Sequence, residues 1–183
     1  MKFDSTINLE TFVSMVYSII TAFILIIAYR QFRTFTIANN AQFLHNMSTL
    51  FFTEETNKLI TIIHADCLKF ELNNNNPVFK IDVTNFNKIY PNRNWELKNY
   101  YTTYEIDLLF LNNLDSLGSL VESNVIKVKA AHQDFGWFVN VALKNTAILS
   151  YLEWLDNYEK TSFVFDKLRK LNIRFQKIND KNN

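Results

Sequence analysis

The stretch FVSMVYSIITAFILIIAY, from Phe12 to Tyr29, contains no charged residue. An α-helix of this length rises about 27 Å, which is close to the thickness of a bilayer hydrocarbon core. Its apolar side chains together favour insertion by roughly 3–6 kcal/mol, and three hydroxyl residues offset part of this. The sequence therefore predicts a transmembrane helix, with residues 1–33 as a membrane anchor.

The stretch has two other interpretations, a cleaved signal peptide and a buried core helix. A cleaved signal peptide begins with a basic segment, but Asp4 and Glu10 here oppose Lys2, and the apolar run ends in Ala28-Tyr29-Arg30 without a small-residue cleavage site. A buried core helix is the second alternative, and such helices seldom stay uncharged for five turns. The anchor remains the favoured interpretation.

The charges that flank the span predict its orientation. Arg30 and Arg33 follow it directly, whereas only Lys2 precedes it. The positive-inside rule then places residues 34–183 in the cytoplasm. We expect a single-pass protein whose cytoplasmic domain comprises residues 34–183.

Hydroxyl side chains recur at helical spacing along the span. Thr11, Ser14, Ser18 and Thr21 fall on one face, and Glu10 lies at its outer end. One interpretation is that these hydroxyls donate to carbonyls of their own helix. The other is a self-association face, or a hydroxyl-lined path through a ring of helices, with Glu10 in a ring at the outer mouth.

The composition of the remaining chain predicts an all-α fold. Two glycines and two prolines in 183 residues leave few turns, and the net charge of +1 gives no overall field for an acidic partner. We expect the first helix to continue from the membrane into an antiparallel helical bundle, with a loop at 73–96 in which Val78 to Val83 could form a strand. The expected helices cover residues 9–51, 53–72, 98–123, 127–144, 146 onward and 161–178.

No arrangement of side chains in the sequence predicts catalysis, a cofactor site or a metal site. His45, His64 and His132 lie in separate expected helices, and none has a second histidine or cysteine at metal-ligand spacing beyond the lone Cys67. Cys67 falls in an apolar pattern, which predicts a buried thiol. A site made of His64, Asp66 and Cys67 is conceivable but unsupported by its spacing.

The C-terminal segment is rich in basic residues. One interpretation is the solvated face of an amphipathic helix. The other is a weak patch for RNA or anionic lipid headgroups, so direct nucleic-acid binding stays open. The residues concerned are Lys160, Lys167, Arg169, Lys170, Arg174 and Lys177.

Three stretches resemble a bacterial family of unknown function that has one N-terminal span and a helical body. They read EIDLLFLNNL at Glu105–Leu114, DFGWF at Asp134–Phe138 and SYLEWL at Ser150–Leu155. The same layout is similar to the small membrane accessory proteins of type VI-B, RNA-targeting CRISPR loci, whose bodies are divergent and HEPN-like. This resemblance implies a HEPN-like body, a location in the bacterial inner membrane and a functional link to an RNA-guided nuclease.

The resemblance further implies a homo-oligomer that gathers its spans into a pore and depolarises the membrane in antiphage defence. The HEPN ribonuclease signature, an arginine followed five to seven positions later by histidine, is missing here. An oligomeric membrane effector, in contact with lipid, is therefore the expected function. The alternative is a membrane-tethered scaffold that binds a cytoplasmic partner, and a ribonuclease is disfavoured.

Overall fold

The computed structural model describes residues 9–51, 53–73, 76–158 and 164–180. The chain divides into two units, one ending at Phe43 and one beginning at Leu44, and each is described by itself. The described chain is mostly helical, as predicted.

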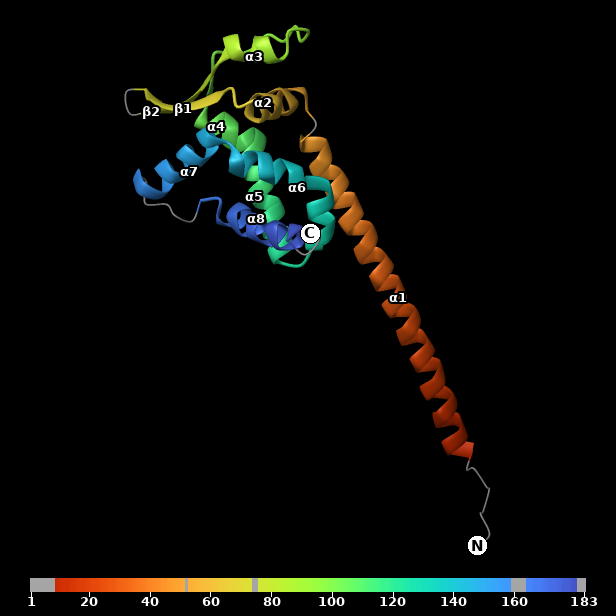
Figure 1. Ribbon diagram of the computed structural model, residues 1–183. Helices are drawn as coiled ribbons and strands as arrows, with labels where there is room; N and C mark the ends of the chain where they lie inside the picture. Colours follow the sequence, from red (N-terminus) through yellow and green to blue (C-terminus); the bar gives the residue numbers. More distant parts are fainter. Residues whose placement is uncertain (1–8, 52, 74–75, 159–163, 181–183) are drawn as a thin grey trace. The chain divides into compact units, whose positions relative to one another are not determined.

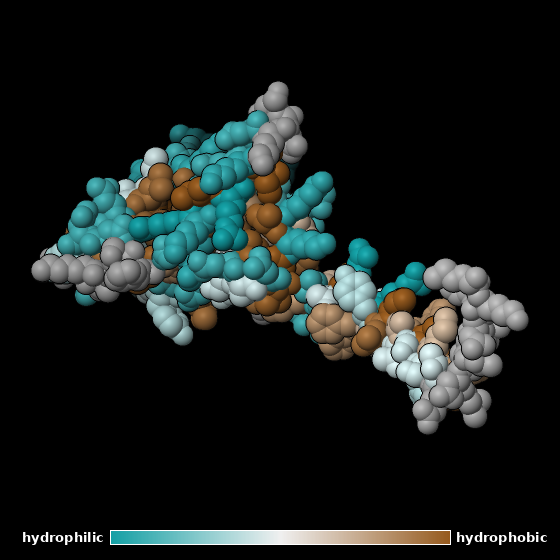
Figure 2. Space-filling view, turned by 90° about the horizontal axis from the view of Figure 1, so that it is seen from below, coloured by the Kyte–Doolittle hydropathy of each residue, from teal (hydrophilic) through white to brown (hydrophobic). Residues whose placement is uncertain are grey.

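The first unit is the apolar part of helix α1, Leu9–Phe51, whose 43 residues match the predicted bounds (Figure 1). The stretch contains neither glycine nor proline, so nothing interrupts the helical hydrogen bonds. Residues Thr11–Thr49 include a window of mean hydropathy 2.3, none of which is buried. In Figure 2 the apolar residues of α1 are visible at the surface. The helix is long and apolar enough to cross a membrane.

The last turns of α1 belong to the second unit, which we call the body. Met47 and Phe51 are buried there. The Phe51 ring lies 5.3 Å from that of Phe135 and 6.3 Å from that of Phe110, distances typical of packed aromatic side chains. An aromatic cluster thus joins the end of α1 to the middle of the body.

Helix α2, Glu54–His64, begins at the N-cap Thr53 and is shorter than predicted. Asp66 has a left-handed backbone with φ of 52°. Its N–H donates to the carbonyl of Ile63, and the N–H of Cys67 donates to that of Ile62. This pair of bonds is a Schellman motif, which ends a helix.

A small antiparallel sheet follows α2 and is the exception to the all-α prediction. Its strands are β1, Leu68–Asn73, β2, Asn76–Ile81, and β3, Tyr100–Thr102, in the order β1-β2-β3. Phe70 pairs with Phe79 across the hairpin. From Leu68 to Leu72, apolar and charged residues alternate with a period of two, which is typical of a strand. The prediction that Cys67 and Leu68 lie on a helix was therefore wrong.

The region 73–96, predicted as a loop, contains β2 and helix α3, Val83–Ile89. The side chain of Asp82 accepts from the N–H of Asn85 and caps α3. The helix predicted from Lys98 to Ser123 is likewise divided. It begins with β3 and continues as α4, Thr103–Ile106, the π-helix η1, Asp107–Leu111, and α5, Asn112–Glu122.

The last three helices follow the predicted pattern closely. They are α6, Val128–Lys144, α7, Thr146–Tyr158, and α8, Asp166–Asn179. Phe165 has a left-handed backbone, so α8 begins later than the predicted Thr161, which lies outside the described residues. Helix α6 packs against α2, α5, α7 and α8, and α5 lies along α8 (Figure 1).

Candidate functional site

The predicted self-association face lies on the exposed part of α1. Thr11, Ser14, Ser18 and Thr21 are exposed, and Glu10 lies in the helix at a position whose side chain is not described. The Ser18 hydroxyl donates to the carbonyl of Ser14 at 2.9 Å, and the Thr21 hydroxyl donates to that of Tyr17 at 2.8 Å. These two bonds fit the interpretation that the hydroxyls donate to carbonyls of their own helix. They leave the hydroxyl oxygens able to accept from a neighbouring helix.

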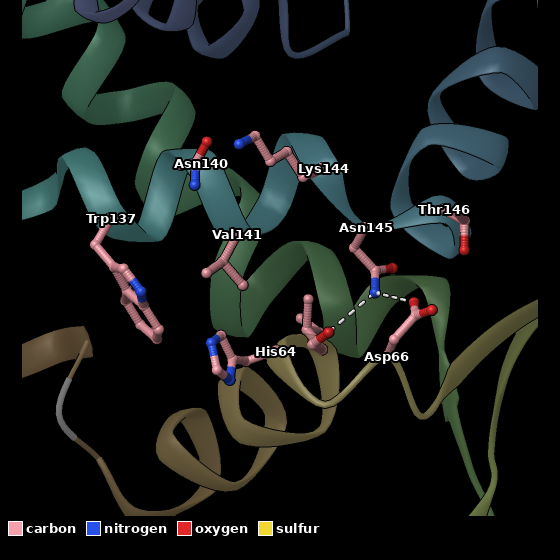
Figure 3. A pocket seen from close by; sticks show the side chains of 9 residues that line it. His64, Asp66, Trp137, Asn140, Val141, Lys144, Asn145 and Thr146 are labelled. Carbon is pink, nitrogen blue, oxygen red and sulfur yellow. Dashed lines mark hydrogen bonds between the residues drawn. The ribbon is translucent and has the colours of Figure 1, made fainter. Parts of the chain in front are cut away.

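In the body, a recess of about 260 Å³ lies between the end of α2 and the end of α6 (Figure 3). Its lining combines two aromatic rings with amide, ammonium, carboxylate and hydroxyl groups. The residues with polar or aromatic side chains are His64, Asp66, Trp137, Asn140, Lys144, Asn145 and Thr146.

Asn145 organises one wall of this recess. It is one of two buried polar residues among those described. Its side-chain oxygen accepts from the N–H groups of Ala147 and Ile148, which caps α7. Its Nδ2 donates to the carbonyl of Ile63 at 3.0 Å and to a carboxylate oxygen of Asp66 at 3.2 Å (Figure 3). One side chain therefore ties the start of α7 to the end of α2.

The opposite wall is aromatic. Trp137 from α6 and His64 from α2 extend toward one another, with their ring centroids 5.4 Å apart (Figure 3). Trp137 is half exposed, which is unusual for so large an apolar ring. The recess could hold a flat or apolar group against these rings while Lys144 or Asp66 contacts a charged end.

The structure separates the residues that the sequence placed near His64. His64 and Asp66 line the recess, but Cys67 is buried, and its Sγ lies 3.4 Å from the carbonyl of Ala65 and 3.6 Å from Nδ2 of Asn85. Burial raises the pKa of the Cys67 thiol, which disfavours the nucleophilic thiolate. Within the described ranges, no group of three His, Cys, Asp or Glu side chains could hold a metal ion.

The basic residues of α8 are mostly paired inside the body. Lys167 and Lys170 both form ion pairs with Glu122, and Arg169 pairs with Asp156 at 2.8 Å. Arg174 donates to the carbonyl of Val121 at 3.3 Å. These contacts hold α8 to its neighbours, so they favour the structural interpretation of the basic segment. Lys160 lies outside the described residues.

Asp107, an acid that the sequence pattern places on the solvated face of a helix, is partly buried in the structure. It begins the π-helix η1, and one carboxylate oxygen accepts from the Tyr151 hydroxyl at 2.8 Å. Its other oxygen, Oδ1, is buried and has no hydrogen-bond partner among the described residues. Burial raises the pKa of Asp107 to about 6, which the bond from Tyr151 partly opposes. Short π-helical segments occur often at functional sites.

Sequence signals existed for part of this arrangement. Asn145 stands directly before the apolar run of α7, as an N-cap does, whereas its second contact with α2 depends on the tertiary fold. Asp107 resembles any acid on an expected helix surface.

No protein family, curated protein or solved structure matches this chain.

Proposed function

We propose that this protein is a single-span membrane protein that self-associates through α1 and carries the body in the cytoplasm. The observation that carries the proposal is α1 itself. Its apolar side chains from Phe12 to Ile27 are exposed. Soluble monomers rarely expose continuous apolar surface of this extent, whereas a bilayer would cover it.

The oligomer is the second step of the proposal. The hydroxyl face of α1 has the spacing with which helices approach closely in membranes, and its oxygens can accept bonds from a second copy. A ring of such helices would form a pore that depolarises the bacterial inner membrane. The resemblance to accessory proteins of RNA-guided nucleases supports a role in antiphage defence. The proposal assigns no enzymatic reaction to the body.

A membrane-tethered scaffold is the alternative function. It is favoured by the bonds that Ser18 and Thr21 make within their own helix, which require no second copy. The exposed recess at Trp137 and His64 would then receive a cytoplasmic partner.

The anchor is tested with the full chain in bacterial cells. We expect it in the membrane fraction after an alkaline carbonate wash, with an intact mass that retains the apolar segment. The variant Ile20→Asp/Ile24→Asp should move to the soluble fraction, because each acid in the middle of a span costs about 2.5–3.5 kcal/mol. The matched variant Phe35→Asp/Ile37→Asp, beyond Arg33, should stay in the membrane.

A wild-type chain that is washed off, or that loses its N-terminal segment by cleavage, would contradict the anchor. Self-association is tested separately by the mass of the detergent-solubilised protein from light scattering. Six or more chains per particle in the wild type would support the ring. The variant Ser14→Leu/Ser18→Leu/Thr21→Leu should then form smaller particles while it still inserts, because leucine preserves insertion. A monomer or dimer would exclude the ring and leave the scaffold.

A further inference from the structure

The strand β1 is the open edge of the body's sheet. The sheet order β1-β2-β3 leaves one side of β1 without a neighbouring strand. The N–H of Asp82 donates to the carbonyl of Cys67 at 2.8 Å, so the backbone of Cys67 faces β2. Backbone groups alternate along a strand, so those of Lys69 and Glu71 also face β2. Leu68, Phe70 and Leu72 therefore present their N–H and C=O groups to the open edge.

Space is available beside this edge. A hollow of about 300 Å³ is lined by Leu68 to Glu71 and by Thr146, Ala147 and Ser150 of α7. No backbone hydrogen bond joins Leu68, Phe70 or Leu72 to another element within the described ranges. No strand of the described ranges therefore occupies this edge.

The sequence of β1 is complementary to itself. Leu68-Lys69-Phe70-Glu71-Leu72 reads apolar, positive, apolar, negative, apolar. If two copies pair antiparallel about Phe70, Leu68 faces Leu72, and Lys69 faces Glu71 of the other copy. The outward-facing backbone groups of Leu68, Phe70 and Leu72 then form the hydrogen-bonded pairs. Lys69 and Glu71 fall in the other type of pair, where opposite side chains lie closest.

The charges on this face support the same register. Lys69 lies directly opposite Lys80 in the hairpin, and like charges in that position repel. Its ion pair with Asp82 is 3.4 Å long and its side chain is 62% exposed, so it contributes little to the single chain. A glutamate from a second copy would place an acid on the side of Lys69 that is open. Leu72, which is 54% exposed, would gain an apolar partner.

From these observations we propose that two copies of this chain pair through β1, antiparallel and centred on Phe70, to form a continuous six-stranded sheet. The partner is a second copy because the pattern of charge and apolar residues in β1 matches its own reverse. This inference rests on the self-association proposed above, but it concerns a different surface from the hydroxyl face of α1.

Cysteine cross-linking of the full chain in detergent tests this register. Cys67→Ser provides the background, and Lys69→Cys and Glu71→Cys are carried on separately tagged copies. The mixed pair should give a disulfide-linked dimer, because opposite residues of a closest pair lie within reach of an S–S bond. Each variant alone should cross-link weakly, since 69 does not face 69 and 71 does not face 71.

Charge reversal provides an independent readout. Lys69→Glu and Glu71→Lys should each weaken dimerisation about tenfold, because both cross-strand pairs of the dimer become repulsive. The double variant Lys69→Glu/Glu71→Lys should restore it. Lys177→Glu, on α8, is the matched control and should have no effect. The melting temperature of each variant shows whether the body is still folded.

The outcomes separate the two proposals. A chain that self-associates but gives no 69-to-71 cross-link would overturn the β1 pairing and leave the α1 association standing. Equal cross-linking of mixed and single variants, or single reversals that the double does not rescue, would overturn it as well. A specific cross-link that persists in Ser14→Leu/Ser18→Leu/Thr21→Leu would support β1 pairing as a separate contact.

Discussion

Two phenylalanines of the same helix lie in opposite surroundings. Phe35 is 63% exposed, whereas Phe51, further along α1, has no exposed surface. Both are ordinary residues of a continuous helix, so helix formation alone does not distinguish them. The burial of Phe51 stabilises the body, and the exposed rings nearer the N-terminus can only gain from a second apolar phase. The comparison separates the residues that hold the fold of the body from those that the fold leaves exposed.

The polar residues of the two regions differ in the same way. In α1, Ser18 and Thr21 donate to carbonyls one turn away and need no other element. In the body, Asn145 bonds α2 and α7 together, and Asp107 bonds to Tyr151 of α7. These hydroxyls of α1 are thus satisfied locally, whereas Asn145 and Asp107 of the body depend on its tertiary structure.

The largest expected difference between the two regions is that between replacing Phe51 and replacing Phe35 by alanine. Phe51→Ala should lower the free energy of unfolding of the body by about 3–5 kcal/mol, because it leaves a cavity among Phe110, Phe135 and Phe138. Phe35→Ala should change it by less than about 0.5 kcal/mol, because the ring is exposed. Denaturant unfolding in detergent, followed by near-UV circular dichroism, measures both. Equal losses would mean that Phe35 is also packed against protein.

The two glycines of the chain, Gly118 in α5 and Gly136 in α6, differ in how closely another part of the body approaches them. A Cβ on Gly118 would clash with the carbonyl oxygen of Lys167, so this glycine permits α5 and α8 to approach. Gly118→Ala should therefore destabilise the body by about 1–3 kcal/mol.

Gly136→Ala is the matched control. Its Cβ would meet only the His132 ring at 3.1 Å, and that side chain can move aside. Since alanine favours a helix over glycine by about 1 kcal/mol, this variant should be neutral or stabilising. Thermal unfolding measures both variants. A Gly118→Ala protein as stable as the wild type would show that α5 and α8 separate easily.

Elements with strong periodicity were predictable from the sequence. The bounds of α1 were predicted as the structure has them, because it contains no glycine or proline, and those of α6 to within a residue, because its apolar stripe continues through Gly136. The predictions of helix failed between residues 65 and 102, where the sheet lies, whereas the strand predicted at Val78 to Val83 overlaps β2. In that region Asp66, a left-handed residue at a position usually occupied by glycine, ends a helix. The alternation of apolar and charged residues that indicates strand β1 covers only a short segment.

The candidate sites show the same limit. The hydroxyl face of α1 is a periodic pattern within one helix, so the sequence contains it, although its role is still a prediction. The recess at Trp137 and the capping of α8 by Asp115, whose carboxylate accepts from the N–H of Leu168, join segments far apart in the chain. Gly118 lies where the backbone of α8 at Lys167 approaches α5. Such contacts have no signature in a single sequence.

The smallest expected effect concerns the one acid of the body whose pKa is strongly raised among the described residues. Burial raises the pKa of Asp107 to about 6, above the value of about 3.9 in an unfolded chain. The folded state therefore binds the proton more tightly. This contribution to stability is fully present below pH 4, and it is lost as the pH rises to about 6.

Asp107→Asn should abolish this pH dependence, because the amide cannot ionise. The wild type should lose about 1 kcal/mol relative to the variant between pH 4 and pH 7, a value reduced from the full shift because the side chain is partly exposed. The difference between the two unfolding free energies is the quantity to measure, since acids such as Glu122, whose pKa is lowered by Lys167, change the stability of both proteins equally. Tyr151→Phe removes the bond that favours the carboxylate, so it should move the loss to higher pH. A difference that stays constant from pH 4 to pH 7 would show that water reaches Asp107, and that the body, like α1, satisfies this polar group without tertiary contacts.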